Sequence, residues 1–474
     1  MSGMVLASNR GPLQFTLHDD GAVSSTRGSG GLISALVPAL EGVPCTWISA
    51  AITDGDRVVA ESGAPMEPPA TAALRMLRLD RTVYERSYHE VSNRALWFLQ
   101  HHLLDAGVVA FDRRFRESWA CYRTVNQSFA EACDRAADTG AEVHVEDYQL
   151  GLAPGMLRAR RPDLRIMHHV YCPWADPDWY GVLPDAMAGE LLHGMLGADV
   201  VGFLTARWAG SFLRCCEAAG LGVDPARGTV RAADGRDVRV RAFPLGVDPD
   251  DLRRLLARAR PEPLVEDGGA RRLIVRVDRM EPTKNITRGL DGYAELLESD
   301  PRYQGAVTHL VVTNLSRGGM SEYQRYRGEV ERRVVEINRR LGRPGWTPVR
   351  LLVLDDHPRA LRALAAADVI VVNPVRDGMN LVAKEAACVN DRSAVLVLSR
   401  EAGAADDLRD GALLVNPFDT AALADAIARA LAMDPAERAR RAALLREAAV
   451  RLPPRAWLAA RRDALAATAP STRR

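Results

Sequence analysis

The chain has 474 residues, of which 47% are hydrophobic and 26% charged, so it can form two or three domains with ordinary cores. Lys and Arg number 62 against 61 Asp and Glu, and the net charge of +1 gives no general attraction to nucleic acid or to an anionic membrane surface. We therefore expect neither partner, and any anion site has to be local.

The first residues, MSGMVLASNR, pass directly from a short apolar strand into polar residues, without the basic flank and longer apolar stretch of a signal peptide. No apolar run approaches the length of a membrane span. The cysteines follow no metal-binding or redox spacing and are odd in number, which argues against a complete disulfide framework. We expect a cytoplasmic protein with reduced thiols at Cys45, Cys121, Cys133, Cys172, Cys215, Cys216 and Cys388.

Short runs rich in Val, Ile and Leu alternate with longer segments of helical periodicity. Ile286, Leu290, Tyr293 and Leu297, for example, recur at the spacing of a crossover helix. This alternation predicts an α/β protein built on parallel sheets covered by helices. The predicted strands lie near residues 4–8, 142–146, 164–171, 199–204, 272–277, 308–313, 350–355, 368–374 and 393–399.

A segment rich in Pro, Gly and Asp, RAFPLGVDPDD at 241–251, separates the strands into two groups. We expect Rossmann-like domains at 1–243 and 244–455, followed by a C-terminal helix or tail at 456–474 that packs Trp457 back on the first domain. A ligand is expected between the domains, at the carboxyl ends of the strands, and the domains are expected to open and close about this segment.

A Gly-rich element, RGSGGLISAL at 27–36, follows the opening strand and leads into an apolar helix. Glycine lets backbone N–H groups approach phosphate or sugar oxygens at the positive end of a helix. A tight strand-to-helix turn without a ligand would give the same pattern, so the element by itself leaves both interpretations open.

Two cations, Arg279 and Lys284, lie in VDRMEPTKNITRGL at 277–290, between a predicted buried strand and a predicted helix. Cations at a helix N-terminus oppose the helix dipole, and a bound pyrophosphate would remove that cost. A solvated loop with incidental charges is the alternative.

The most specific pattern is NPVRDGMNLVAKEAA at 373–387, which places a polar loop at a strand end and Glu385 on the helix that follows. Successive backbone N–H groups in such a loop can bind a diphosphate, and a carboxylate one to two turns along can accept hydrogen bonds from ribose hydroxyls. A buried turn with a satisfied aspartate would also fit. The loop residues are Asp377, Gly378, Met379 and Asn380.

These motifs resemble the trehalose-6-phosphate synthase family of glycosyltransferases, in particular its actinobacterial members and the related pseudo-glycosyltransferases of aminocyclitol biosynthesis. The second half contributes VDRMEPTKN, SRGGMSEYQRYRGEVE, GWTP, NPVRDGMNLVAKE, LSREAGA and LLVNPFD. The first half contributes SNRGP, GSGGL, TWISA, YHEVSNRALW, EDYQL and ARWAGSFLR. The resemblance spans nearly the whole chain and implies a GT-B fold, with two Rossmann-like domains facing a central cleft.

The resemblance implies that the second domain binds a nucleotide diphosphate sugar, with UDP or GDP as the nucleotide and no cofactor. Arg279 and Lys284 match residues that bind the donor phosphates, Asp377 matches one that binds hydroxyls of the donor sugar, and Glu385 matches a ribose contact. The pyrophosphate would be held by the backbone amides of Gly378, Met379, Asn380 and Leu381.

The same resemblance implies that the first domain binds the acceptor, a sugar or a sugar phosphate such as glucose 6-phosphate. Asp147 matches a contact to an acceptor hydroxyl, and Gly31 would approach the donor from this domain. Two arginines suit a phosphate dianion, because guanidinium groups bind it in a bidentate manner. The residues that match phosphate-acceptor positions are Arg10, Tyr88, Trp97 and Arg317; without the resemblance, the two aromatic residues would also fit core packing.

The chain departs from the family at two histidines. The first histidine of the family's His-Asp-Tyr triplet is Glu146, and the donor-facing histidine of its His-Ile-Pro-Trp-Pro motif is Tyr171. His168 and His169 lie nearby, but strand alternation would not put both at the missing position, so we expect them to pack in the sheet. A neutral phenol in place of imidazole predicts an altered pocket for the donor sugar, with Tyr171 still facing the donor.

The implied reaction is retaining hexosyl transfer, in which the acceptor hydroxyl attacks the anomeric carbon from the face that the diphosphate leaves. In the family this reaction forms an α,α-1,1 linkage. The candidate catalytic residues are Asp147, Arg279, Lys284 and Asp377, and the two cations would stabilise charge on the leaving diphosphate. The altered pocket favours aminosugar or aminoglycoside antibiotic biosynthesis.

Other functions stay open: an ordinary trehalose-6-phosphate synthase, a pseudo-glycosyltransferase that joins cyclitols through a C–N bond, or a non-catalytic sensor of a nucleotide sugar. We expect a small-molecule donor and acceptor as partners, and the sequence leaves a homo-oligomer open. We expect no metal, because the adjacent acidic residues have ordinary interpretations as turns or helix caps. These residues are Asp176, Asp178, Asp355 and Asp356.

Overall fold

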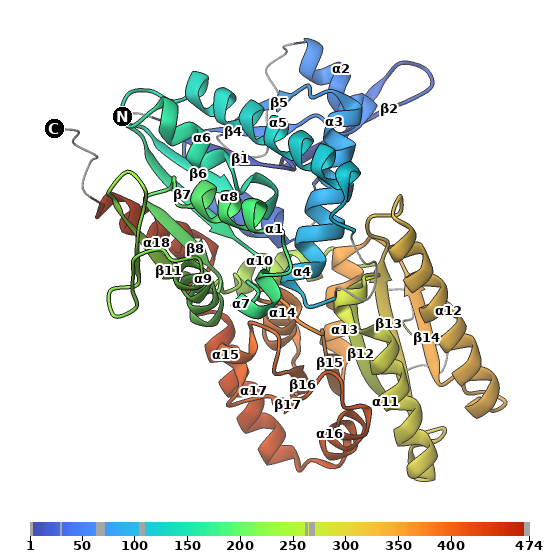
Figure 1. Ribbon diagram of the computed structural model, residues 1–474. Helices are drawn as coiled ribbons and strands as arrows, with labels where there is room; N and C mark the ends of the chain where they lie inside the picture. Colours follow the sequence, from blue (N-terminus) through green and yellow to red (C-terminus); the bar gives the residue numbers. More distant parts are fainter. Residues whose placement is uncertain are drawn as a thin grey trace. The chain divides into compact units, whose positions relative to one another are not determined.

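The computed structural model describes residues 3–28, 31–62, 72–103, 110–260, 264 and 271–468. It divides into two compact units, which we call unit 1 (Met1–Leu245 with Pro454–Arg474) and unit 2 (Gly246–Pro453). Each unit contains a largely parallel sheet covered by helices (Figure 1), and the predicted α/β class is confirmed. None of the described helices combines the length and the apolar composition of a membrane-spanning segment.

The main sheet of unit 1 contains β1 (Met4–Ser8), β4 (Cys45–Ala50), β5 (Ala72–Leu77), β6 (Glu142–Glu146), β7 (Arg165–Val170), β8 (Val200–Phe203), β9 (Val223–Asp224), β10 (Thr229–Arg231) and β11 (Asp237–Ala242). Their order is β5-β4-β1-β6-β7-β8-β11-β10-β9. The strands from β5 to β11 pair in parallel, and β10 and β9 add an antiparallel edge. A separate hairpin is formed by β2 (Leu13–Leu17) and β3 (Val23–Arg27).

The helices of unit 1 are α1 (Gly31–Ala39), α2 (Asp54–Ser62), α3 (Arg81–Glu85), α4 (Phe98–Gln100), α5 (Arg113–Ala136), α6 (Ala153–Arg160), α7 (Pro177–Tyr180), α8 (Asp185–Met195), α9 (Ala206–Ala218) and α18 (Pro454–Ala466). A π-helix, η1 (Arg86–Trp97), joins α3 to α4, and a short 3-10 helix, η3 (Tyr148–Leu150), follows β6. The helix α18 packs on α1, β7 and β8, so the C-terminal end of the chain belongs to unit 1.

The sheet of unit 2 is parallel throughout, in the order β14-β13-β12-β15-β16-β17. Its strands are β12 (Arg272–Arg279), β13 (Val307–Asn314), β14 (Val349–Val353), β15 (Val369–Val372), β16 (Val395–Ser399) and β17 (Leu413–Val415). The central strands are apolar and buried along nearly their whole length, as a sheet covered on both faces requires.

Two groups of helices cover this sheet. The contacts join α11 (Ile286–Ser299) to α12 (Ser321–Leu341) and α16 (Thr420–Ala432) in one group. The other group contains α10 (Pro249–Leu256), α13 (His357–Ala366), α14 (Leu381–Val389), α15 (Ala405–Leu408) and α17 (Pro435–Ala449). Two short 3-10 helices, η4 (Pro282–Lys284) and η5 (Pro301–Tyr303), lie in the connections.

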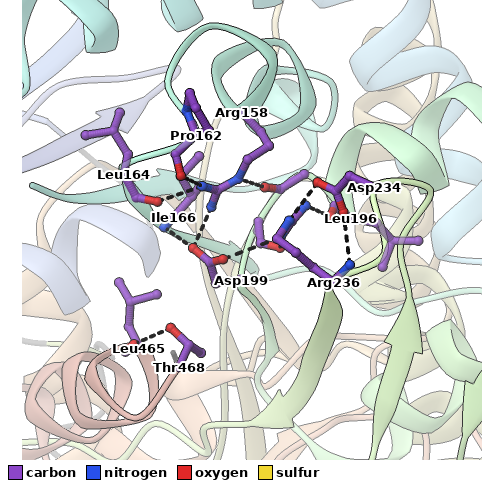
Figure 2. Close-up of polar contacts among 12 residues, drawn as sticks. Arg158, Pro162, Leu164, Ile166, Leu196, Asp199, Asp234, Arg236, Leu465 and Thr468 are labelled. Carbon is purple, nitrogen blue, oxygen red and sulfur yellow. Dashed lines mark hydrogen bonds and ion pairs between the residues drawn. The ribbon is translucent and has the colours of Figure 1, made fainter. Parts of the chain in front are cut away.

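A buried ion-pair cluster holds the amino ends of β7, β8 and β11 together in unit 1. Asp199 Oδ2 accepts hydrogen bonds from Arg158 Nη2 at 2.6 Å and from the backbone N–H of Ile166 at 2.8 Å, and Arg236 Nη1 lies 3.4 Å from Asp199 Oδ1 (Figure 2). Arg158 also donates to three backbone carbonyls. These contacts lie at the edge of the sheet opposite the carboxyl ends, so their role is structural.

We expect Asp199→Asn to destabilise the protein, because it leaves Arg158 buried without a carboxylate and removes a partner of Arg236. Breaking a buried ion pair costs about 3 to 5 kcal/mol. The matched control is Glu61→Gln, whose carboxylate pairs with Arg78 at 2.7 Å on the surface, with side chains 52% and 56% exposed. The urea midpoint should fall clearly for D199N and hardly for E61Q; equal midpoints would contradict the assignment.

Candidate active site

In unit 2, the motif with the two cations lies where β12 ends. Arg279 is the last residue of β12, and Lys284 is the last residue of η4. Asn285 takes a left-handed conformation, φ 57°, that leads the chain into α11. Its Nδ2 donates to the carbonyl oxygens of Asn373 at 3.0 Å and Pro417 at 2.7 Å, so the loop is fixed from two sides.

A fully buried carboxylate, Glu281, lies beside these cations. Its Oε1 is 2.9 Å from Arg279 Nη1 and 4.0 Å from Arg317 Nη1, and it accepts a 2.8 Å hydrogen bond from Ser316 Oγ. Burial raises the pKa of Glu281, but the charges of Arg279, Arg317 and Lys284 outweigh it and bring the pKa to about 2. Glu281 is therefore ionised and orients both guanidinium groups.

The ammonium group of Lys284 forms an ion pair with Asp377 Oδ2, and both side chains are largely buried. Asp377 belongs to the loop between β15 and α14, and its Oδ1 accepts from the backbone N–H of Met379 at 3.4 Å. Its Oδ2 also accepts from Asn380 Nδ2 at 3.2 Å. These contacts hold the ammonium and the carboxylate in a fixed arrangement beside the end of the sheet.

Backbone hydrogen bonds tie the same loop to residues 401–404. The N–H of Asp377 donates to the carbonyl of Glu401 at 3.2 Å, and the N–H of Gly403 donates to the carbonyl of Asp377 at 3.0 Å. The N–H of Ala404 donates to the carbonyl of Met379 at 2.6 Å. The loop therefore has a defined conformation before any ligand binds.

The helix α14 begins at the end of this loop. Asn380, with φ 74°, caps it by accepting a 3.3 Å hydrogen bond from the N–H of Ala383. Gly378 precedes this cap and Leu381 opens the helix, whose first N–H groups have no partners within the helix and favour an anion. Glu385 lies one turn along, with Oε1 3.4 Å from His357 Nε2.

Arg276, inside β12, contacts both the loop that follows β12 and the loop that follows β15. It is fully buried, and its Nη2 donates to the carbonyl of Lys284 at 2.8 Å and to Asn373 Oδ1 at 2.6 Å. Its Nε donates to Asp278 at 2.8 Å. One side chain thus connects the loop of Lys284 with the end of β15.

The two cations, Arg279 and Lys284, are already paired within the protein, which the sequence pattern did not predict. The pattern alone indicated that an external anion would be needed to offset Arg279 and Lys284 near a helix N-terminus. The structure shows that Glu281 and Asp377 already lie beside them. A diphosphate would therefore share cations that the protein has already oriented.

In unit 1, the loop after β1 presents Arg10 as an exposed side chain. Ser8 Oγ donates to the carbonyl of Arg10 at 2.6 Å and accepts from Trp47 Nε1 at 2.7 Å, which anchors the loop on β4. Arg10 Nη2 donates to the hydroxyl of Tyr88 at 3.2 Å, and Tyr88 stacks on Tyr84 with 5.6 Å between ring centroids. The structure therefore brings Arg10 and Tyr88 together.

Tyr88 and Trp97 both lie on the π-helix η1, a rare form that occurs frequently at functional sites. Trp97 is 9% exposed and packs on Tyr148 with 5.7 Å between ring centroids. The hydroxyl of Tyr148 donates to Asn93 Oδ1 at 3.1 Å. Most of the Trp97 side chain is therefore packed in the core, whereas Tyr88 is half-buried.

Asp147 follows β6 with φ 71° and ψ 169°, a region that glycine alone adopts readily. Its Oδ1 accepts a 3.1 Å hydrogen bond from the backbone N–H of Tyr171, and its own N–H donates to the carbonyl of His169 at 2.7 Å. Strain of this kind costs about 1–3 kcal/mol and persists only where surrounding contacts impose it. The turn fixes the carboxylate at the carboxyl ends of β6 and β7.

Glu146 and Tyr171, the two residues that the resemblance aligns with family histidines, contact each other. The hydroxyl of Tyr171 donates to Glu146 Oε2 at 2.9 Å, and Glu146 Oε1 accepts a 2.6 Å hydrogen bond from Arg461 Nη2. Burial and then the charge of Glu146 raise the pKa of Tyr171 well above its ordinary value, so the phenol keeps its proton. His168 and His169 are fully buried in β7, in agreement with the expectation that they pack in the sheet.

The Gly-rich motif is only partly described. Gly31 opens α1, and a Cβ at this position would meet no described atom within 4 Å, whereas Ser29 and Gly30 lie outside the described residues. Its role toward a donor stays a prediction. Among the described residues, no group of three or more His, Cys, Asp or Glu side chains is placed to hold a metal ion.

Sequence reasoning missed Glu281, Arg276 and Arg461. Glu281 could have been predicted from its position between Arg279 and Lys284, because a carboxylate so close in sequence can pair with either cation. For Arg461 the signal was helical spacing: it falls on the face of α18 that buries Pro454, Trp457, Leu458 and Leu465.

We expect Glu281→Gln to destabilise the protein in a pH-dependent manner. The folded pKa near 2 lies below the ordinary 4.5, so the ionised carboxylate stabilises the fold above about pH 5, and this stabilisation is lost as the pH falls toward 2. The difference in unfolding free energy between wild type and E281Q should be roughly 3 kcal/mol at pH 7 and should shrink at pH 3. Chemical denaturation at both pH values measures it, and a constant difference would contradict an ionised Glu281.

Known proteins resemble this chain over most of its length. Trehalose-6-phosphate synthase of Mycobacterium tuberculosis is 37% identical over 448 residues, which cover 91% of this chain and 88% of that protein. The solved structure of the E. coli trehalose-6-phosphate protein bound with UDP-2-fluoro glucose has a TM-score of 0.86 at 28% identity, covering 99% of this chain and 100% of that one.

An α,α-trehalose-phosphate synthase (UDP-forming) from Burkholderia xenovorans, solved in complex with glucose-6-phosphate, has a TM-score of 0.85 at 28% identity and covers 98% of this chain and 100% of that one. The predicted GT-B fold with Rossmann-like units is thereby confirmed. The sequence pattern of glycosyltransferase family 20 matches residues 2–466. The chain therefore belongs to glycosyltransferase family 20.

Proposed function

We propose that this protein transfers a hexosyl group from a nucleotide diphosphate sugar to a hydroxyl of a sugar or sugar phosphate, with retention of configuration and an α,α-1,1 linkage. The observation that carries the proposal is the ion pair of Lys284 and Asp377 beside the N-terminus of α14. The ammonium and the helix N–H groups suit a diphosphate, and the carboxylate suits sugar hydroxyls. Membership of glycosyltransferase family 20 supports the same reaction.

The donor is assigned to unit 2. Arg279, Lys284 and the amides of residues 378–381 bind the diphosphate in this proposal, Asp377 binds hydroxyls of the donor sugar, and Glu385 binds the ribose. Gly31 and Tyr171 approach the donor from unit 1. We expect UDP as the nucleotide before GDP, because one similar structure holds UDP-2-fluoro glucose and another is described as UDP-forming.

The proposed mechanism uses no side-chain nucleophile. The acceptor hydroxyl attacks the anomeric carbon from the face on which the diphosphate leaves, and a diphosphate oxygen takes the acceptor proton. Arg279 and Lys284 stabilise the charge that builds on the leaving group, and electrostatic stabilisation of this kind is usually the largest catalytic contribution. Glu281 contributes indirectly, because it orients Arg279 before the substrate binds.

The acceptor is assigned mainly to unit 1. Arg10 is exposed and held by Tyr88, which suits a phosphate group, and Asp147 presents a carboxylate to the attacking hydroxyl. Trp97 would line the sugar, and Arg317 of unit 2 would complete phosphate binding. The glucose-6-phosphate bound to the Burkholderia xenovorans relative supports a phosphorylated acceptor.

A narrower proposal concerns the donor sugar. The single hydroxyl of Tyr171 lies at a different distance from the backbone than the nitrogen atoms of an imidazole would. Sites that bind sugars through hydrogen bonds reject mismatched sugars strongly. We therefore propose a donor other than the usual glucose conjugate, as in aminosugar or aminoglycoside biosynthesis. An ordinary trehalose-6-phosphate synthase is the alternative, and efficient use of UDP-glucose would favour it.

We expect one nucleoside diphosphate among UDP, GDP and ADP to stabilise the protein against heat, because a ligand at a hundred times its dissociation constant adds about 2.7 kcal/mol. Lys284→Ala should weaken the binding of that diphosphate about tenfold or more, because a charge-assisted hydrogen bond is lost. The control is Arg327→Ala on α12, where Arg327 pairs with Glu331. No stabilisation by any of the three would contradict the donor site.

We expect Arg10→Ala to raise KM for glucose 6-phosphate about tenfold or more while changing activity toward unphosphorylated glucose little, because the lost guanidinium binds the phosphate. Nucleotide release measures both rates, with a donor that carries the nucleotide identified by thermal stabilisation. Arg81→Ala, which removes an exposed arginine paired with Asp54, is the control. An equal loss with both acceptors would contradict a phosphate contact.

Two outcomes would replace the proposal. Binding of a nucleotide sugar with no transfer to sugar acceptors, but with turnover of cyclitol substrates, would identify a pseudo-glycosyltransferase that forms a C–N bond. Binding without turnover of either class would identify a sensor.

A further inference from the structure

A chain of polar contacts in unit 1 runs from the C-terminal helix to the turn that holds Asp147. Glu146 is the last residue of β6 and is fully buried, as is Arg461 on α18. Their ion pair spans 2.6 Å, and the other carboxylate oxygen of Glu146 accepts the hydroxyl of Tyr171 at 2.9 Å. The backbone N–H of Tyr171 then donates to Asp147 Oδ1 at 3.1 Å.

The position of Arg461 is fixed by its surroundings. Its guanidinium lies 4.4 Å from the ring centroid of Trp457, and Trp457 Nε1 donates to the carbonyl of Phe243 at 2.9 Å. Arg461 Nη2 also donates to His144 Nδ1 at 3.2 Å. Among the described residues, Glu146 is the only carboxylate that forms an ion pair with Arg461, so the buried charge depends on it.

We propose that Arg461 is a positioning residue for the site at the carboxyl ends of β6 and β7: it fixes Glu146, Glu146 fixes the ring of Tyr171, and Tyr171 fixes the carboxylate of Asp147. The inference rests on the proposed function only where it names what Asp147 binds. It also makes the two departures from the family a single feature, because Tyr171 donates a hydrogen bond to Glu146 and Arg461 is the counter-ion of Glu146.

The hydrogen bond from Tyr171 to Glu146 limits which ligand groups can bind the phenol oxygen. A phenol has one proton, and Tyr171 gives that proton to Glu146. Toward a substrate its oxygen can therefore only accept a hydrogen bond. A ligand group that reaches this oxygen has to be a donor, either a hydroxyl or an ammonium group.

Hydrogen exchange on the full-length protein tests the positioning role without a substrate. The reporters are the amides of Asp147 and Tyr171, which are hydrogen-bonded in the turn. In Arg461→Met we expect both to exchange about tenfold faster or more, because the contacts that close the turn are weakened. The matched control is Arg462→Met on the same helix, which pairs with Glu142 at 3.1 Å, at the opposite end of β6, and should leave both amides unchanged.

Tyr171→Phe removes only the hydroxyl and keeps the test valid if Arg461→Met does not fold. It should also speed exchange at Tyr171 and Asp147, and Arg461→Lys should restore part of the protection by keeping the charge. Unchanged exchange at these two amides in Tyr171→Phe and in folded Arg461→Met would overturn the proposal, as would equal acceleration in Arg462→Met.

Calorimetry with UDP and with glucose 6-phosphate separates this inference from the proposed function. In Arg461→Met we expect glucose 6-phosphate to bind about tenfold more weakly and UDP to bind as in wild type, a difference that general destabilisation would not produce. If wild type binds neither probe, UDP and glucose 6-phosphate are not its ligands, and the exchange rates still decide the role of Arg461.

Discussion

The guanidinium of Arg461 is buried inside unit 1, and the carboxylate of Glu146 beside it offsets the cost of burying that charge. The same requirement operates in unit 2, where Glu281 lies between Arg279 and Arg317, and where Lys284 faces Asp377. Pairing within the protein holds each of these side chains in one orientation. The groups assigned to substrate are therefore largely organised before a substrate arrives.

Strand order explains how loops distant in the sequence become neighbours. In unit 2, β12 lies between β13 and β15, so the end of β12 and the loops that follow β13 and β15 adjoin and bring Arg279, Arg317 and Asp377 to one edge. In unit 1, β1, β6 and β7 are adjacent, and the residues that follow them include Arg10, Asp147 and Tyr171. In both units the carboxyl ends of parallel strands gather the polar residues, as open α/β sheets generally do.

Glu146 and Tyr171, the two departures expected from the family pattern, are coupled by a hydrogen bond. Replacing a histidine by glutamate adds a buried negative charge, which would be costly alone. Arg461 compensates that charge, and the phenol of Tyr171 supplies a donor to the remaining oxygen. Glu146, Tyr171 and Arg461 are therefore linked by contacts within unit 1.

The sequence alone predicts the α/β class, nine of the strands and the segments that carry Arg279, Lys284 and Asp377, because hydrophobic periodicity and motif spacing are local properties. It did not reveal β4, whose residues matched only as a motif, nor the π-helix η1. The ion-pair partners follow only from the folded chain: Lys284 pairs with a carboxylate 93 residues away and Arg461 with one 315 residues away. Strand order and helix packing set such contacts, and no local pattern records them.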